Sequence, residues 1–189
     1  VDPDKIVLGG GSAGAHVAQL AGYTPEHPEL TPEELQDANL TVCGLLTYYP
    51  PTDLVAGSEH YNDQRQPPVP LGTEVNPKNP MLYAGRLDIL LGGYPEDVPD
   101  VYRLANPTTH VYPGSPPTLS LRGDRDCLNP LEGNEELYAA LVEAGVPAID
   151  VVLPWTQHAF DLMFPQVSPP AQSALYDVDR FLALLLNRD

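Results

Sequence analysis

A serine flanked by glycines stands between a predicted strand and a predicted helix near the start of the chain. Residues 5–8 (KIVL) are a short apolar run that ends in three glycines, and Ser12 follows within Gly-x-Ser-x-Gly, from Gly10 to Gly14. Beyond the serine, small and apolar residues recur at helical spacing, at Ala13, Val17, Leu20 and Ala21. A strand, a tight turn and a helix in this order indicate a turn that lifts the serine above the edge of a sheet.

This setting suits a serine nucleophile. A serine hydroxyl attacks a carbonyl at neutral pH only when a base takes its proton and a carboxylate orients that base. The backbone N–H of Ala13 would donate to the oxyanion that forms, because the helix after the serine turns its positive end toward it. The alternatives are a glycine-rich turn with an idle serine, or a phosphate cradle, although the turn lacks the Gly-Lys-Ser/Thr ending of a phosphate loop.

The histidine best placed to act as the base is His158. It follows a predicted strand at 149–153, and open α/β sheets keep their chemistry at the carboxyl ends of their strands. His16 lies one turn after Ser12 on the same helix, and we expect it to have a structural role. The remaining histidines fall in proline-rich loops without metal-ligand spacing, so we expect no metal and no cofactor. They are His27, His60 and His110.

Two aspartates follow another predicted strand, at 117–123. Asp126 reaches further into the loop and is the candidate partner of His158, whereas Asp124 is expected to cap the turn or to pair with Arg125. Either could instead be an ordinary turn-forming aspartate. The serine, the aspartate and the histidine each follow a different strand, in the order Ser…Asp…His.

Strands and helices alternate along the whole chain. Strands are predicted at 5–8, 40–49, 117–123 and 149–153. Helices are predicted after Ser12, from Thr31, near 81–91 and 98–104, and at 135–144 and 171–187, the last with a buried face of Leu175, Val178, Phe181, Leu182 and Leu185. This alternation predicts an α/β fold, a mostly parallel sheet with helices on both faces. We expect one domain over 1–189, in which the Pro-, Gly-, Asn- and Asp-rich stretch 54–116 is an excursion over the sheet.

Charge and composition exclude several partners. The 26 acidic residues against nine Lys and Arg give a formal charge of −17, which argues against nucleic acid or an anionic membrane surface. No apolar run is long enough to span a membrane. Cys43 and Cys127 are expected to be thiols, which slightly favours the cytoplasm without fixing the compartment.

Four stretches together resemble the α/β-hydrolase fold, and within it the esterases and lipases that include the hormone-sensitive-lipase-like enzymes. They are VDPDKIVLGGGSAGAH at 1–16, LLTYYPPTDL at 45–54, PPTLSLRGDRDCLNPLE at 116–132 and GVPAIDVVLPWTQHAFD at 145–161. The resemblance implies a nucleophile at Ser12, an acid–base catalyst at His158 and its partner at Asp126. Cys127 departs from the pattern, because such enzymes usually have proline there.

The reaction implied is hydrolysis of a small carboxylic ester through an acyl-enzyme. The residues expected to line the substrate pocket are Gly11, Tyr48, Tyr49 and Trp155. Three alternatives stay open: an amide or peptide hydrolase such as a formamidase, a non-catalytic binding relative, and an inactive fragment. The expected cover over the site is the excursion at 54–116.

In the family that the chain resembles, about four more strands precede the serine, and a His-Gly-Gly-Gly-type loop supplies further oxyanion donors. Nothing in these 189 residues corresponds to them. We therefore expect the carboxyl-terminal half of a longer hydrolase, with the strand at 5–8 at a sheet edge. A homodimer or a complementing amino-terminal half could cover that edge, and the isolated chain is expected to be weakly active at best.

Overall fold

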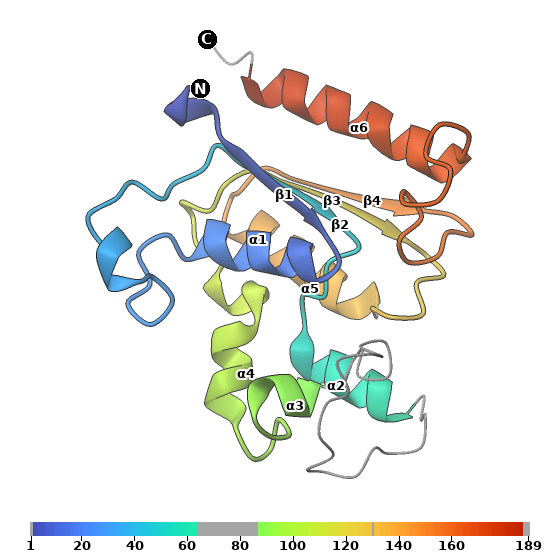
Figure 1. Ribbon diagram of the computed structural model, residues 1–189. Coiled ribbons are helices and arrows are strands. Elements are labelled where there is room, and N and C mark those ends of the chain that lie inside the picture. The colour runs from blue at the N-terminus through green and yellow to red at the C-terminus, as the bar shows by residue number, and fades with distance from the viewer. Residues whose placement is uncertain (1, 64–86, 130, 187–189) are drawn as a thin grey trace.

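One parallel sheet organises the chain (Figure 1). The computed structural model describes residues 2–63, 87–129 and 131–186, without the side chains of 60–63. The strands are β1 (Val7–Gly11), β2 (Gly44–Tyr48), β3 (Thr118–Gly123) and β4 (Ala148–Leu153), and they lie side by side in chain order. Every pairing is parallel. The carboxyl ends of all four strands therefore lie at the same edge of the sheet.

Strand β3 is buried on both faces of the sheet. All six residues of β3 are buried, and Leu45, Leu119 and Leu121 have no exposed surface. All four predicted strands are present, and the largest boundary differences are at the first two. The second strand starts at Gly44 rather than at residue 40, and β1 continues through its glycines to Gly11, where it pairs with Tyr48.

Helices cover both faces of the sheet, which confirms the predicted α/β fold. They are α1 (Ala13–Tyr23), α2 (Leu54–Asp63), α3 (Leu87–Leu91), α4 (Pro99–Ala105), α5 (Leu131–Glu143) and α6 (Pro169–Leu186), with 3-10 turns η1 (Pro3–Lys5), η2 (Glu33–Leu35) and η4 (Pro107–His110). Figure 1 shows α6 on one face and α1 and α5 on the other. Leu119, Leu121 and Phe181 belong to the core beneath α6, and Leu45 and Leu137 to the core beneath α1 and α5.

The buried face of α1 differs from the residues that predicted the helix. Val17 is 62% exposed, whereas Ala15, Ala18 and Gly22 are buried. The helix lies so close to β2 that a Cβ at Gly22 would come within 2.7 Å of Leu45 Cδ2. Small residues are therefore needed where the inner face of α1 meets β2, whereas Val17 faces outward and the larger Tyr23 is buried at the end of the helix.

Three other helix predictions need correction or restriction. The helix start at Thr31 produces only the 3-10 turn η2, because no apolar periodicity follows it. On α6, Leu175 is 47% exposed, and Ala171 and Ala174 complete the buried face instead. Of the helix expected near 81–91, residues 81–86 lie outside the described chain, and the rest is α3. The helix near 98–104 is confirmed as α4.

The excursion between β2 and β3 contains α2, α3, α4 and η4. These elements lie together beyond α1 and α5 (Figure 1), and η4 contacts both of those helices. Over the described ranges, no helix combines the length and the apolar composition needed to cross a bilayer. Cys43 and Cys127 form no disulfide.

Candidate active site

Ser12 occupies a sharp turn between β1 and α1. Its backbone has φ 55° and ψ −125°, and residues other than glycine rarely adopt such a positive φ. The serine N–H donates to the Tyr48 carbonyl at 2.9 Å, which ties the turn to β2. A Cβ at Gly10 would collide with the Gly14 carbonyl, so the close packing of strand against helix requires glycine there. The turn holds the Ser12 side chain beyond the carboxyl edge of the sheet.

His158 and Asp126 come to the same edge from the loops after β4 and β3. The Ser12 Oγ lies 3.0 Å from His158 Nε2, and His158 Nδ1 lies 2.8 Å from Asp126 Oδ2. A proton on Nδ1 that bonds to the carboxylate leaves Nε2 as the acceptor that faces the hydroxyl. Hydroxyl, imidazole and carboxylate therefore form one continuous hydrogen-bonded array.

Backbone groups fix the carboxylate of Asp126. Its Oδ1 accepts from the N–H groups of Leu128 at 2.8 Å and Asn129 at 3.0 Å, which leaves Oδ2 to face the imidazole. The side chain of Asp126 is 2% exposed and that of His158 is 12% exposed. Asp124 points elsewhere: its Oδ1 accepts from the Thr156 N–H at 3.3 Å and lies 3.9 Å from Arg125 Nε, as expected for a turn residue.

The expected pocket residues differ in their exposure. Trp155 is 81% exposed. The Arg125 guanidinium lies over its ring, with 4.4 Å between Arg125 Cζ and the ring centre. Tyr48 is half-buried, and Gly11 is exposed at the end of β1. Tyr49 is only 3% exposed, and its ring lies 4.5 Å from the His158 ring. Ala13 is the first residue of α1, at the positive end of the helix.

Two residues at the site escaped the sequence reasoning. Asp161 accepts a 2.6 Å hydrogen bond from the Tyr49 hydroxyl, and the Asn129 side-chain amide donates to the Tyr49 carbonyl at 2.7 Å. Burial raises the pKa of Tyr49, and the bond to Asp161 raises it further, so the hydroxyl keeps its proton. The only available signal was the position of Asp161, three residues after His158, and a lone aspartate at that spacing predicts nothing by itself.

The other described histidines have local partners. His16 Nε2 lies 2.8 Å from the Ala105 carbonyl, and burial lowers the pKa of this histidine despite that bond. His27 and His110 are half-buried and pack edge to face with ring centres 5.3 Å apart, rather than lying apart at the surface. His60 has no described side chain. In the portion covered by the structure, no group of three or more His, Cys, Asp or Glu could hold a metal ion.

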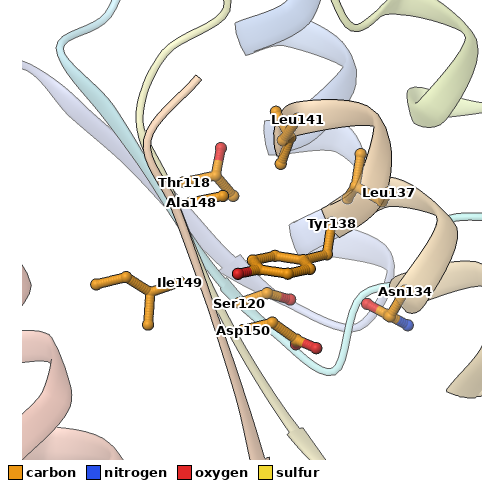
Figure 2. Close-up of a pocket in the computed structure, with 9 residues that line it drawn as sticks. All are labelled: Thr118, Ser120, Asn134, Leu137, Tyr138, Leu141, Ala148, Ile149 and Asp150. Atoms are coloured by element: carbon orange, nitrogen blue, oxygen red, sulfur yellow. The ribbon is translucent and has the colours of Figure 1, made fainter. Parts of the chain in front are cut away.

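Two cavities lie away from Ser12. Figure 2 shows the smaller one, between α5 and strands β3 and β4, where Tyr138 and Asn134 face Ser120 and Asp150. Its volume is about 10 Å³, and the buried Ser120 Oγ and Asn134 Oδ1 have no hydrogen-bond partner among the described residues. The larger cavity, about 420 Å³, adjoins Tyr23 at the amino-terminal edge of the sheet. Neither is lined by the Ser–His–Asp array.

Proteins of similar sequence include two from Mycobacterium tuberculosis. Esterase LipQ is 29% identical over 99% of this chain, which covers 39% of LipQ. The probable carboxylic ester hydrolase LipM is 28% identical over 96% of this chain, which covers 38% of LipM. The chain thus spans about two fifths of the length of these curated relatives.

Solved structures of similar fold include an esterase of Thermogutta terrifontis. Its butyrate-bound form is 25% identical, with a TM-score of 0.68 over 100% of this chain and 60% of that one. The same esterase phosphonylated by sarin gives a TM-score of 0.70 at 24% identity, over 97% of this chain and 58% of that one.

A parallel sheet covered on both faces, with these structural neighbours, defines a protein of the α/β-hydrolase fold. Within this fold, the BD-FAE family model matches residues 1–141. The chain belongs to the BD-FAE family, and the expected kinship with esterases and lipases is confirmed.

Proposed function

We propose that this protein hydrolyses carboxylic esters, with Ser12 as nucleophile, His158 as general acid–base and Asp126 as the carboxylate that orients the imidazole. The observation that carries the proposal is the unbroken array from the Ser12 hydroxyl through both nitrogens of His158 to Asp126, with links of 3.0 and 2.8 Å. Three residues far apart in sequence meet at these distances beyond the carboxyl edge of one sheet, where α/β folds carry out chemistry.

The reaction follows in two steps. Ser12 Oγ bonds to the ester carbonyl carbon while His158 Nε2 takes the hydroxyl proton. His158 then gives this proton to the departing alkoxide, and the acyl group stays on Ser12. In the second step water attacks the acyl carbon, His158 takes a proton from the water, and that proton returns to Ser12 as the acid leaves. Asp126 stays ionised and stabilises the imidazolium in both steps.

The oxyanion of each step needs donors. We propose the backbone N–H of Ala13 as one of them, since it lies in the first turn of α1, where the helix dipole favours negative charge. A single donor of this kind contributes roughly 3 to 4 kcal/mol to transition-state stabilisation. Gly11, Tyr48 and Trp155 are proposed to line the pocket, and the excursion 54–116 to form part of its cover within one domain spanning residues 1–189.

Similarity supports ester hydrolysis in particular. LipQ is named an esterase and LipM a probable carboxylic ester hydrolase, and the similar solved structure is an esterase with butyrate bound. The same esterase was also obtained phosphonylated by sarin, and such an organophosphorus reagent suits a test for a reactive serine.

The test is covalent labelling of the purified protein with a fluorophosphonate, followed by mass mapping of the adduct. We expect the adduct on Ser12, and we expect Ser12→Ala and His158→Ala to lower short aryl-ester turnover by roughly 10³- to 10⁶-fold. Parallel assays with a phenyl ester and an aminoacyl amide compare ester with amide hydrolysis. A faster amide reaction would make the protein an amidase, and no adduct on Ser12 would favour a non-catalytic relative or an inactive fragment.

A further inference from the structure

Tyr49 lies where the three loops of the site meet. It directly follows β2, and its backbone adopts φ 41°, a left-handed conformation that its surroundings must hold in place. Its ring packs against the His158 ring at 4.5 Å and edge-on to Phe160 at 5.6 Å between ring centres. A side chain in this position can limit where the imidazole lies.

The hydroxyl of Tyr49 is hydrogen-bonded to the loop that carries His158. It donates to Asp161 Oδ1 at 2.6 Å, a short bond of the charge-assisted kind. Within this loop Trp155 and Ala159 both have positive φ, near 55°, so the loop requires anchors on each side of the histidine. Before His158 the anchor is Thr156, whose carbonyl accepts from the Arg125 N–H at 3.0 Å. After it, the anchor is Asp161 on Tyr49.

Tyr49 also contacts the loops of the other two site residues. Its carbonyl accepts from the Asn129 side chain at 2.7 Å, while the Asn129 N–H donates to Asp126 Oδ1. On the opposite side, a Cβ added to Gly11 would come within 2.9 Å of the Tyr49 hydroxyl, so this hydroxyl abuts the backbone next to Ser12. One side chain thus spans the loops of nucleophile, base and carboxylate.

We propose that Tyr49 is a positioning residue, whose hydroxyl bond to Asp161 holds the His158 imidazole between Asp126 and Ser12. This inference rests on the proposed function for the role of His158, and it replaces the expected role of Tyr49 as a pocket wall. Tyr49 is not a catalytic residue, because its hydroxyl is buried and already bonded. A loop released from Asp161 would let the imidazole move, and a misplacement of about 1 Å can slow a reaction by about 100-fold.

The test compares Tyr49→Phe with Tyr23→Phe, a matched control. Tyr23 is also buried, at 2% exposure, and its hydroxyl lies 3.0 Å from the Thr118 hydroxyl at the opposite edge of the sheet. Each variant loses one buried hydroxyl bond, so we expect similar losses of thermal stability. Only Tyr49→Phe should slow fluorophosphonate labelling of Ser12, by about 10- to 100-fold, whereas Tyr23→Phe should change it less than twofold.

Asp161 provides a second set of variants in case Tyr49→Phe fails to fold, since it is only partly buried. Asp161→Ala should reproduce the slow labelling, and Asp161→Asn, which keeps an acceptor oxygen, should recover most of the rate. The double variant Tyr49→Phe/Asp161→Ala should be no slower than the slower single variant, because both changes remove the same bond.

Proton NMR provides a readout that does not depend on reactivity. The His158 Nδ1 proton, bonded to Asp126, should give a far-downfield signal that persists in Tyr23→Phe and broadens in Tyr49→Phe and Asp161→Ala. If wild type forms no adduct on Ser12, the proposed function fails and this signal alone decides the positioning role. If Ser12 is labelled equally fast in Tyr49→Phe and Tyr23→Phe with the signal intact, the positioning role fails and the hydrolase proposal stands.

Discussion

At the scale of single residues, most of the left-handed backbone conformations lie around the site. Of the five described non-glycine residues with positive φ, Ser12, Tyr49, Trp155 and Ala159 lie on the turns and loops around the Ser–His–Asp array. Each such conformation costs on the order of 1–3 kcal/mol and persists only where surrounding bonds hold it. Here those bonds come from neighbouring strands, such as the Ser12 N–H to the Tyr48 carbonyl.

Asp126→Asn should lower ester hydrolysis by roughly 10³- to 10⁴-fold with little loss of stability. Oδ1 accepts from two backbone N–H groups, so asparagine keeps its oxygen there and turns its NH₂ toward His158 Nδ1. His158 then carries its proton on Nε2 and no longer accepts from the Ser12 hydroxyl. The control is Asp124→Asn, which keeps its turn acceptor and should react at nearly the wild-type rate. Turnover of a phenyl ester measures both, and equal rates for the two variants would remove Asp126 from the mechanism.

The buried His16 leads us to expect that the folded protein becomes less stable in acid. Burial lowers its pKa in the folded state, while the unfolded chain protonates histidine near pH 6.5. The unfolded state therefore binds more protons below about pH 6.5, so stability should decrease as the pH falls from there toward the lowered native pKa. The melting temperature of His16→Gln, whose side chain does not titrate, should depend less steeply on pH over that window. Parallel curves for the two proteins would contradict this assignment.

At the scale of elements, strands β3 and β4 share a buried ion pair. Arg122 Nη2 lies 2.7 Å from Asp150 Oδ2, with side-chain exposures of 4% and 12%, and Arg122 Nη1 donates to the Leu131 carbonyl at the start of α5. The pair joins two strands and a helix on the face opposite α6. Glu135, 67% exposed at 3.8 Å, is the other carboxylate near this guanidinium among the described residues.

Asp150→Ala should destabilise the protein by about 3 kcal/mol, because it leaves the Arg122 charge buried with only the exposed Glu135 nearby. The double variant Arg122→Met/Asp150→Leu should recover most of that loss, since an apolar pair needs no desolvation of charge. Urea unfolding measures both. A loss below about 1 kcal/mol in the single variant would show that solvent reaches the arginine.

At the scale of the whole molecule, apolar surface and net charge oppose each other. Leu162, Met163 and Phe164 are consecutive and each at least 70% exposed, and β1 has only β2 as a neighbour in the described sheet. Exposed apolar surface and an open strand edge both favour association. The formal charge of −17 opposes association through mutual repulsion of the molecules.

Self-association should therefore increase with salt, which screens the repulsion, and as the pH falls toward the sequence pI of about 4.3. Light scattering of the protein as it elutes from a size-exclusion column, at low and at high ionic strength, measures the particle mass. Leu162→Gln/Phe164→Gln should lower the association at high salt, and Val142→Gln, which changes an exposed apolar residue elsewhere without changing the charge, is the control. A monomeric mass at every salt concentration would contradict the prediction.

The sequence by itself determined the strands, the fold class and the identity of the three residues of the Ser–His–Asp array. Short strand-forming segments such as 5–8 and 149–153 alternate with helical ones, and Ser12, Asp126 and His158 each follow a different predicted strand. Because parallel strands place their carboxyl ends at one edge, the order of the chain already implied that these three side chains converge.

Only the tertiary structure decided which helix faces are buried and how the imidazole is held. Val17 and Leu175 fit a helical pattern but face outward. On α1 the close approach to β2 requires a small residue at Gly22, and on α6 Ala171 and Ala174 are buried beside Val178 and Phe181. The Tyr49–Asp161 hydrogen bond joins residues 112 positions apart, and no local sequence pattern predicts it. Hydrophobic periodicity reflects the amphipathic pattern of a single helix or strand. Packing distances and long-range hydrogen bonds are set only when helices and strands pack against one another.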